Sequence, residues 1–109
     1  MTTQSLNPED FQNEICDDAT ILIDVRTPEE KGKFGYIQGT DLFLDMHNDG
    51  FFEDILKLDR KKKYLTYCWH ANRTGYLINF MKNAGFEYVK DLSGGTENWE
   101  KTGFQLIKA

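Results

Sequence analysis

The sequence has little of several features that each define a class of protein. It holds two cysteines in 109 residues, too few for the disulfide framework of a small secreted domain. Cys16 lies in an acidic segment expected at the surface, so we expect Cys16 and Cys68 to be reduced; a disulfide between them is the alternative. No apolar run is long enough to cross a bilayer, and residues 1–8 have neither a basic segment nor an apolar signal region. These absences predict a cytoplasmic protein with no membrane partner.

Basic residues are also in the minority. Thirteen lysines and arginines face eighteen acidic residues, giving a net charge of −5. The one basic run, at 60–63, leads into an expected strand and is typical of a solvated turn. Nucleic acid is therefore not an expected partner. With 39% hydrophobic residues and no internal repeat, the chain is expected to form one compact core, a single domain over residues 1–109.

Segments typical of strands and of helices alternate along the chain. Residues 21–25 are a nearly continuous apolar run, as in a strand covered on both faces, and Lys63–Tyr67 is expected to be a second buried strand. This order predicts an α/β fold with a central, mostly parallel sheet and helices on both faces. The other expected elements are a helix starting at Pro8, a short helix after Thr27, a strand at 42–44, helices at 51–58 and 74–84, a strand at Tyr88–Leu92, and a short helix containing Trp99.

Local signals mark the ends of two of these helices. Thr27, Pro28 and Glu30 have the pattern of a capping box with proline in the first turn. In the helix at 74–84, apolar residues recur at the spacing of a core-facing stripe, and Gly85 is suited to the position after its end. That stripe consists of Leu77, Phe80, Met81 and Ala84.

The segment with the most chemical content is the end of the strand at Lys63–Tyr67. The strand runs into Cys68, and a helix is expected to begin near Arg73. Unpaired N–H groups and the positive end of the helix dipole would then face the thiol and favour its thiolate. We predict a nucleophilic Cys68; a buried structural cysteine is the alternative. A metal site is not expected, because His70, His47 and Cys16 show no zinc-ligand spacing with Cys68.

Four segments together resemble one family. Residues 23–26 end a buried strand in Asp24 and Arg26, and Thr-Pro-Glu-Glu follows. Residues 35–40 read Gly-Tyr-Ile-Gln-Gly-Thr, similar to a Gly-His-Ile-x-Gly-Ala segment. Residues 68–74 are similar to a six-residue active loop, and residues 92–99 to a Gly-Gly…Trp segment. In order and spacing they resemble the single-domain rhodanese-like sulfurtransferases.

The resemblance implies a rhodanese-like fold and a sulfurtransferase that needs no cofactor. The Cys68 thiolate would take sulfane sulfur from thiosulfate or polysulfide, hold it as a persulfide, and pass it to cyanide, a thiol or a protein thiol. Asp24 and Arg26 would support the site structurally. The residues expected to surround the sulfur are those of the active loop: Trp69, His70, Ala71, Asn72, Arg73 and Thr74.

Two other functions fit parts of this pattern. Cysteine phosphatases and arsenate reductases also pair a cysteine with an arginine, but the phosphatase loop has five intervening residues and this loop has four, which suits sulfur better than phosphate. A rhodanese-like binding or regulatory module usually lacks the cysteine. Because the loop carries Trp69 and His70 but no lysine, we expect persulfide or polysulfide to suit it better than thiosulfate. Whether Arg73 binds substrate or locks the loop stays open here.

Overall fold

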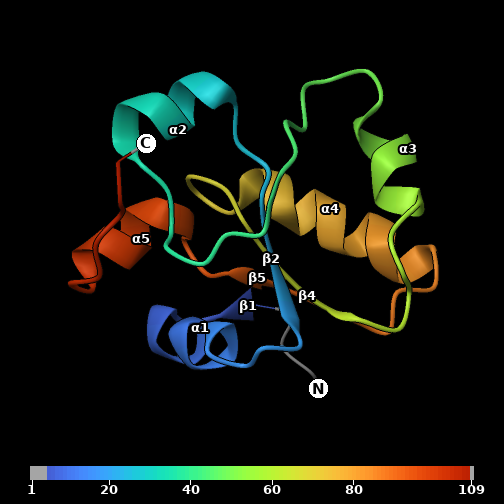
Figure 1. The fold of residues 1–109 in the computed structure, drawn as a ribbon, viewed down its shortest axis with the longest axis horizontal. Coiled ribbons are helices and arrows are strands. Elements are labelled where there is room, and N and C mark those ends of the chain that lie inside the picture. The colour runs from blue at the N-terminus through green and yellow to red at the C-terminus, as the bar shows by residue number, and fades with distance from the viewer. Residues whose placement is uncertain (1–4, 109) are drawn as a thin grey trace.

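A computed structural model describes residues 5–108, and its centre is a five-stranded sheet in which every pair of neighbours is parallel (Figure 1). Residues 1–4 and 109, and with them part of the segment used to argue against a signal region, lie outside the described part. The strand order is β1-β5-β4-β2-β3. The bounds are Ser5–Leu6 for β1, Thr20–Asp24 for β2, Leu42–Phe43 for β3, Lys63–Tyr67 for β4 and Tyr88–Leu92 for β5.

Helices cover both faces of the sheet, as the alternating segments predicted. In Figure 1, α1 and α5 lie on one side of the sheet, α3 and α4 lie on the other, and α2 lies beyond the carboxyl end of β2. The bounds are Pro8–Ile15 for α1, Pro28–Phe34 for α2, Phe51–Leu56 for α3, Asn72–Asn83 for α4 and Gly95–Lys101 for α5. No helix within residues 5–108 is both long and apolar enough to span a bilayer.

Most element boundaries agree with the sequence to within two residues. The capping box at Thr27 and Glu30 is present, and Gly85 takes a left-handed conformation after α4. Strand β1 was not predicted from the sequence, because a two-residue strand shows no periodicity. This strand exists through pairing with β5, and the Ser93 N–H extends the pairing by donating to the Leu6 carbonyl at 2.8 Å.

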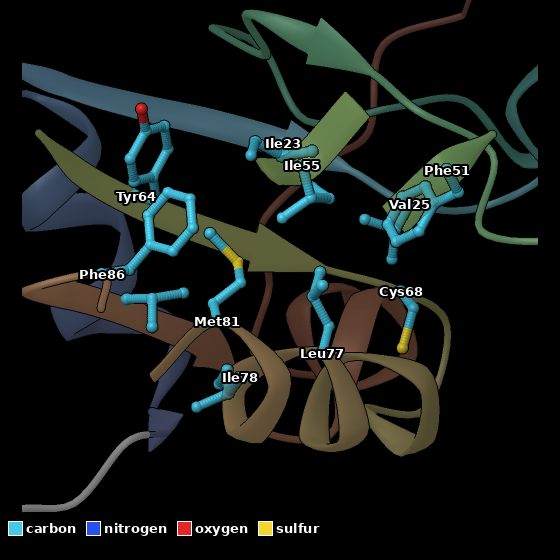
Figure 2. Packing of buried hydrophobic residues seen from close by; sticks show 11 residues of the cluster. Ile23, Val25, Phe51, Ile55, Tyr64, Cys68, Leu77, Ile78, Met81 and Phe86 are labelled. Carbon is cyan, nitrogen blue, oxygen red and sulfur yellow. The ribbon is translucent and has the colours of Figure 1, made fainter. Parts of the chain in front are cut away.

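Side chains alternate between two core clusters, one on each face of the sheet. Along β4, Tyr64 and Cys68 belong to the cluster under α3 and α4, whereas Leu65 and Tyr67 belong to the cluster under α1 and α5. Figure 2 shows the first of these clusters, with Leu77 and Met81 of α4 directed at the sheet. Both faces of the buried strands are therefore covered, which is why residues 21–25 are almost continuously hydrophobic.

The connections reverse direction between the two central strands. From β2 the chain moves to β3, toward one edge of the sheet. From β4 it moves through α4 to β5, toward the opposite edge. In open α/β sheets such a switch point leaves a crevice at the carboxyl ends of the strands, where ligands bind. Asp24 at the end of β2 and Cys68 just after β4 both lie at this edge.

Candidate functional site

Cys68 lies where the chain leaves the sheet after β4. Its residue is 1% exposed and belongs to the core cluster beside α4, and Figure 2 shows its sulfur directed toward that helix. Both cysteines are free, and Cys16 is exposed as expected. The predicted nucleophile is therefore an enclosed, reduced thiol next to the start of α4.

The loop enters α4 through an unusual backbone conformation at Ala71. This residue has φ 73°, in the left-handed region, and its carbonyl accepts a hydrogen bond from the Gly75 N–H at 3.0 Å. Such a conformation costs about 1 kcal/mol or more for a residue with a Cβ. No side chain caps the helix that starts at Asn72, whose own side chain is exposed. The helix therefore begins without the side-chain acceptor that usually occupies its first N–H groups.

Helix α5 holds the loop from the other side. The N–H groups of Thr96 and Glu97 donate to the carbonyls of Cys68 and Trp69 at 2.9 and 3.2 Å. Gly95 makes this approach possible, because a Cβ there would lie 2.1 Å from the Trp69 carbonyl oxygen, and its φ of +66° favours glycine. The Gly-Gly segment thus brings the start of α5 against the loop backbone.

This anchoring also sets the direction of the loop N–H groups. In a trans peptide the N–H points opposite to the carbonyl. Since the carbonyls of Cys68 and Trp69 point at α5, the N–H groups of Trp69 and His70 point away from it. This orientation is the one that the prediction requires, because N–H groups that point away from α5 can face a bound sulfur anion.

Arg73 is held by a carboxylate of α2. Its two terminal nitrogens donate to the two oxygens of Glu30, each at 2.8 Å. Glu30 also completes the capping box by accepting from the Thr27 N–H at 3.0 Å. The sequence left open whether Arg73 binds substrate or locks the loop. The contact with Glu30 is the one expected for locking the loop.

The ion pair shifts both partners toward their charged forms. The hydrogen bond from Arg73 lowers the pKa of Glu30 to about 2, against the opposing effect of its burial. The pKa of Arg73 is raised by the hydrogen bond of Glu30, against its own burial, and the charges of Glu30, Cys68 and Asp24 add to the rise. The ion pair thus keeps both side chains charged at neutral pH.

Asp24 and Arg26, expected to be supporting residues, form a buried pair. A terminal nitrogen of Arg26 donates to Asp24 at 2.9 Å and to the Gly35 carbonyl at 2.6 Å, and both side chains are at most 2% exposed. Burial lowers the pKa of Arg26, but the hydrogen bond and charge of Asp24 outweigh it, so the net shift is upward. The pair joins the end of β2 to the end of α2. The charged groups of Asp24 and Arg26 bond to each other.

Thr74 connects the thiol to a buried carboxylate. The Thr74 hydroxyl oxygen lies 3.7 Å from the Cys68 sulfur and 2.8 Å from an oxygen of Asp91 on β5. Asp91 is 2% exposed, and its other oxygen accepts a hydrogen bond from the Ser5 hydroxyl. A chain of polar contacts thus runs from β1 through β5 and α4 to the sulfur.

Trp69 and His70 form the outer surface of the loop. The Trp69 ring is stacked on the His70 ring, with centroids 4.7 Å apart, and its other neighbour is the Phe34 ring at 5.2 Å. Trp69 is nevertheless 40% exposed. The Nδ1 atom of His70 lies 3.6 Å from a carboxylate oxygen of Glu97. The two rings therefore bridge α2 and α5 across the loop while staying accessible to solvent.

Three acidic residues at the site were absent from the sequence-based set: Glu30, Asp91 and Glu97. A usable signal existed for Asp91, since it is an acidic residue near the carboxyl end of an expected strand, as Asp24 is. Glu30 was recognised only as a helix cap. Within residues 5–108 no group of three His, Cys, Asp or Glu side chains is arranged to hold a metal ion.

Comparison with known proteins identifies the family. The chain is 26% identical over 110 residues to the thiosulfate sulfurtransferase GlpE of Actinobacillus succinogenes, covering all of this chain and 95% of that protein. It is 30% identical over 105 residues to a tRNA uridine(34) hydroxylase of Listeria monocytogenes, covering 93% of this chain. The match covers only 32% of the length of that hydroxylase.

The fold has close counterparts among solved structures. The crystal structure of a rhodanese-related protein from Thermoplasma volcanium superposes with a TM-score of 0.80 at 29% identity, covering 95% of this chain and 97% of that one. The rhodanese-like domain model matches residues 7–102, which include the loop, α5 and both central strands. The chain therefore belongs to the rhodanese-like domain family, and the fold predicted from its four sequence segments is confirmed.

Proposed function

We propose that this protein is a sulfurtransferase that carries sulfane sulfur on Cys68. The observation that carries the proposal is the enclosed thiol at the end of β4, with a four-residue loop whose carbonyls are bound by α5 and whose arginine is held 2.8 Å from Glu30. Such a loop is held at both ends, and the N–H groups of Trp69 and His70 point away from α5, as binding of a small sulfur anion requires. The similarity to a thiosulfate sulfurtransferase over the whole chain supports the same chemistry.

The proposed transfer has two steps. The Cys68 thiolate attacks the outer sulfur of the donor, a new S–S bond forms, and the donor's S–S bond breaks. Its electron pair leaves on sulfite when the donor is thiosulfate, on the shortened polysulfide when it is a polysulfide, and on a thiolate when it is a persulfide. A nucleophilic acceptor then attacks the outer sulfur of the Cys68 persulfide. The bond to Cys68 breaks, and its electron pair returns to the cysteine as a thiolate. No cofactor takes part in either step.

The charges at the loop favour some donors over others. Arg73 is the one fixed cation of the loop, and Glu30 already balances it. Thiosulfate carries an oxyanion group that needs binding partners beyond those of the outer sulfur, whereas the negative charge of a persulfide or a polysulfide lies on sulfur itself. We therefore propose persulfide or polysulfide as the better donor. The proposal does not include tRNA, because the match to the hydroxylase covers about a third of that protein and the net charge here is −5.

Intact-mass measurement after incubation with polysulfide or thiosulfate tests the proposal. The wild-type protein should gain one sulfur atom that a reducing thiol removes, and gain it faster from polysulfide. The Cys68→Ser variant should gain none, and the matched Cys16→Ser variant, which lacks the exposed thiol, should gain it as the wild type does. Absence of sulfur from the wild-type protein, or its loss in Cys16→Ser, contradicts the proposal.

Two further measurements separate the alternatives. Hydrolysis of an aryl phosphate that depends on Cys68, without sulfur uptake, would identify a cysteine phosphatase. A partner that binds wild type and Cys68→Ser equally, again without sulfur uptake, would identify a binding module. The four-residue loop argues against the first, and the enclosed free thiol argues against the second.

A further inference from the structure

We propose that Asp91 is a positioning residue that holds the Thr74 hydroxyl with its oxygen, not its proton, toward Cys68, and so sets the pH range in which the thiol reacts. The geometry is a chain of three groups: the Cys68 sulfur, the Thr74 hydroxyl at 3.7 Å, and an Asp91 oxygen at 2.8 Å from that hydroxyl. The role in catalysis rests on the proposed function, but the chemistry at the thiol can be measured without it.

The single proton of Thr74 decides how the hydroxyl faces the sulfur. Three acceptors lie near it: Asp91 at 2.8 Å, the Ala71 carbonyl at 3.2 Å and the Cys68 sulfur at 3.7 Å. An ionised carboxylate only accepts hydrogen bonds and is the strongest acceptor of the three. The proton therefore points at Asp91, and a lone pair of the Thr74 oxygen faces Cys68.

That orientation distinguishes the two forms of the thiol. A lone pair accepts the S–H proton of the neutral thiol, but it repels a thiolate. The negative charge of Asp91 acts in the same direction, because it lies behind Thr74 in the buried interior. Both effects oppose the stabilisation of the thiolate expected from the start of α4 and from Arg73.

Asp91 differs from the other charged groups around the site in having no cation for a partner. Within residues 5–108, its carboxylate accepts side-chain hydrogen bonds from the hydroxyls of Ser5 and Thr74 and forms no ion pair. The other charged side chains described at the loop and at the adjacent strand end occur in oppositely charged or titratable pairs: Asp24 with Arg26, Glu30 with Arg73, and Glu97 with His70 and Lys101. The charge of Asp91 is thus the one that is not balanced locally.

In the proposed reaction this arrangement favours the sulfur-loaded protein. In a persulfide the negative charge lies on the outer sulfur, one S–S bond farther from Thr74 and Asp91 than a charge on Cys68 itself. The same two groups therefore disfavour a persulfide anion less than a thiolate. Asp91 thus favours the neutral thiol, the form less open to unwanted oxidation, over the thiolate, while it tolerates the loaded state.

The test is the pH dependence of alkylation of Cys68 by iodoacetamide, a neutral reagent, in a Cys16→Ser background. This reaction reports thiolate formation and needs no sulfur donor, so it remains informative if the proposed function fails. The Asp91→Asn variant should lower the pH of half-maximal rate by about one unit, because an amide removes the charge and can donate to the Thr74 oxygen. Asp41→Asn is the matched control: its carboxylate binds the Leu22 N–H, and its loss should leave the profile unchanged.

A second pair of variants isolates the role of the hydroxyl. Thr74→Val removes the hydroxyl with little change of shape, and in that background Asp91→Asn should shift the profile by less than half as much. Thr74→Ser keeps the hydroxyl and should restore the full effect. If Asp91→Asn does not fold, Asp91→Ser provides the uncharged comparison. No shift, an upward shift, or an equal shift with Thr74→Val would each overturn the positioning role.

Discussion

At the residue scale, the pair of Glu30 and Arg73 is the strongest charged contact of the loop. Bidentate geometry at 2.8 Å and partial burial, with side chains 18% and 23% exposed, raise it above the ordinary surface ion pair. It joins α2 to the first turn of α4, residues 43 positions apart in sequence. The loop is therefore held at a charged point as well as by the backbone contacts of α5.

This pair should make folding stability depend on acidity. Because the pKa of Glu30 is lowered from 4.5 to about 2, its contribution is complete above pH 4.5 and is lost as the pH falls toward 2. Glu30→Gln should remove on the order of 1–3 kcal/mol at pH 7 and much less at pH 2. Urea unfolding of both proteins across this range measures the difference. A difference in stability that is the same at pH 7 and pH 2 would show that the charge of Glu30 contributes nothing.

At the element scale, α5 is joined to the loop because two consecutive residues have left-handed backbones, Gly94 at φ 74° and Gly95 at φ 66°. Helix starts usually bind the oxygen of a capping side chain. Here the N–H groups of Thr96 and Glu97 bind loop carbonyls instead. Helix α5 thus shapes the loop through its backbone N–H groups, in addition to the contact of its Glu97 side chain with His70.

Gly95→Ala should accordingly displace the loop. Its Cβ would meet the Trp69 carbonyl oxygen at 2.1 Å, which only backbone movement can relieve. We expect a loss of at least about 2 kcal/mol in stability and a large fall in the rate of sulfur uptake by Cys68.

Gly75→Ala is the control for this change. Gly75 lies inside α4 without a left-handed φ, and a Cβ at this position would meet no atom of another element within 4 Å. Alanine should therefore stabilise the protein by about 0.5–1 kcal/mol. Thermal unfolding and persulfide formation measure both variants. Equal behaviour of the two alanine variants would show that Gly95 is no closer to the loop than Gly75.

At the scale of the whole molecule, the sheet separates two core clusters but also joins them, since adjacent residues of β2 and β4 contribute to opposite faces. Phe11 of α1 and Leu77 of α4 are each fully buried, one in each cluster. Loss of packing on either face must therefore weaken the strands on which the other face depends.

Phe11→Ala and Leu77→Ala should both destabilise the whole protein in a single transition. The expected losses are about 3–5 kcal/mol for Phe11→Ala and about 2–5 kcal/mol for Leu77→Ala. Denaturant unfolding followed by two probes, tryptophan fluorescence and far-UV circular dichroism, should give coincident curves for each variant. Separate transitions for the two probes would show that the layers fold independently.

Local sequence patterns were enough to predict the α/β class, the two central strands, the capping box at Thr27 and the position of Cys68 at the end of β4. These features depend on side-chain periodicity and on residues a few positions apart, which a single sequence displays directly. The order of four family-like segments also identified the fold. Cys68 and Arg73 were proposed as site residues from local order alone, because a strand, a loop and a helix follow each other along the chain there.

Which groups meet around the thiol became visible only in three dimensions. Arg73 binds Glu30, Thr74 binds Asp91, and β1 exists through its pairing with β5. These contacts join residues from 17 to 86 positions apart, and their geometry depends on the strand order and on which face each strand presents. Neither the spacing nor the type of a residue contains that information, because the same carboxylate can cap a helix, face solvent or hold a hydroxyl beside a sulfur.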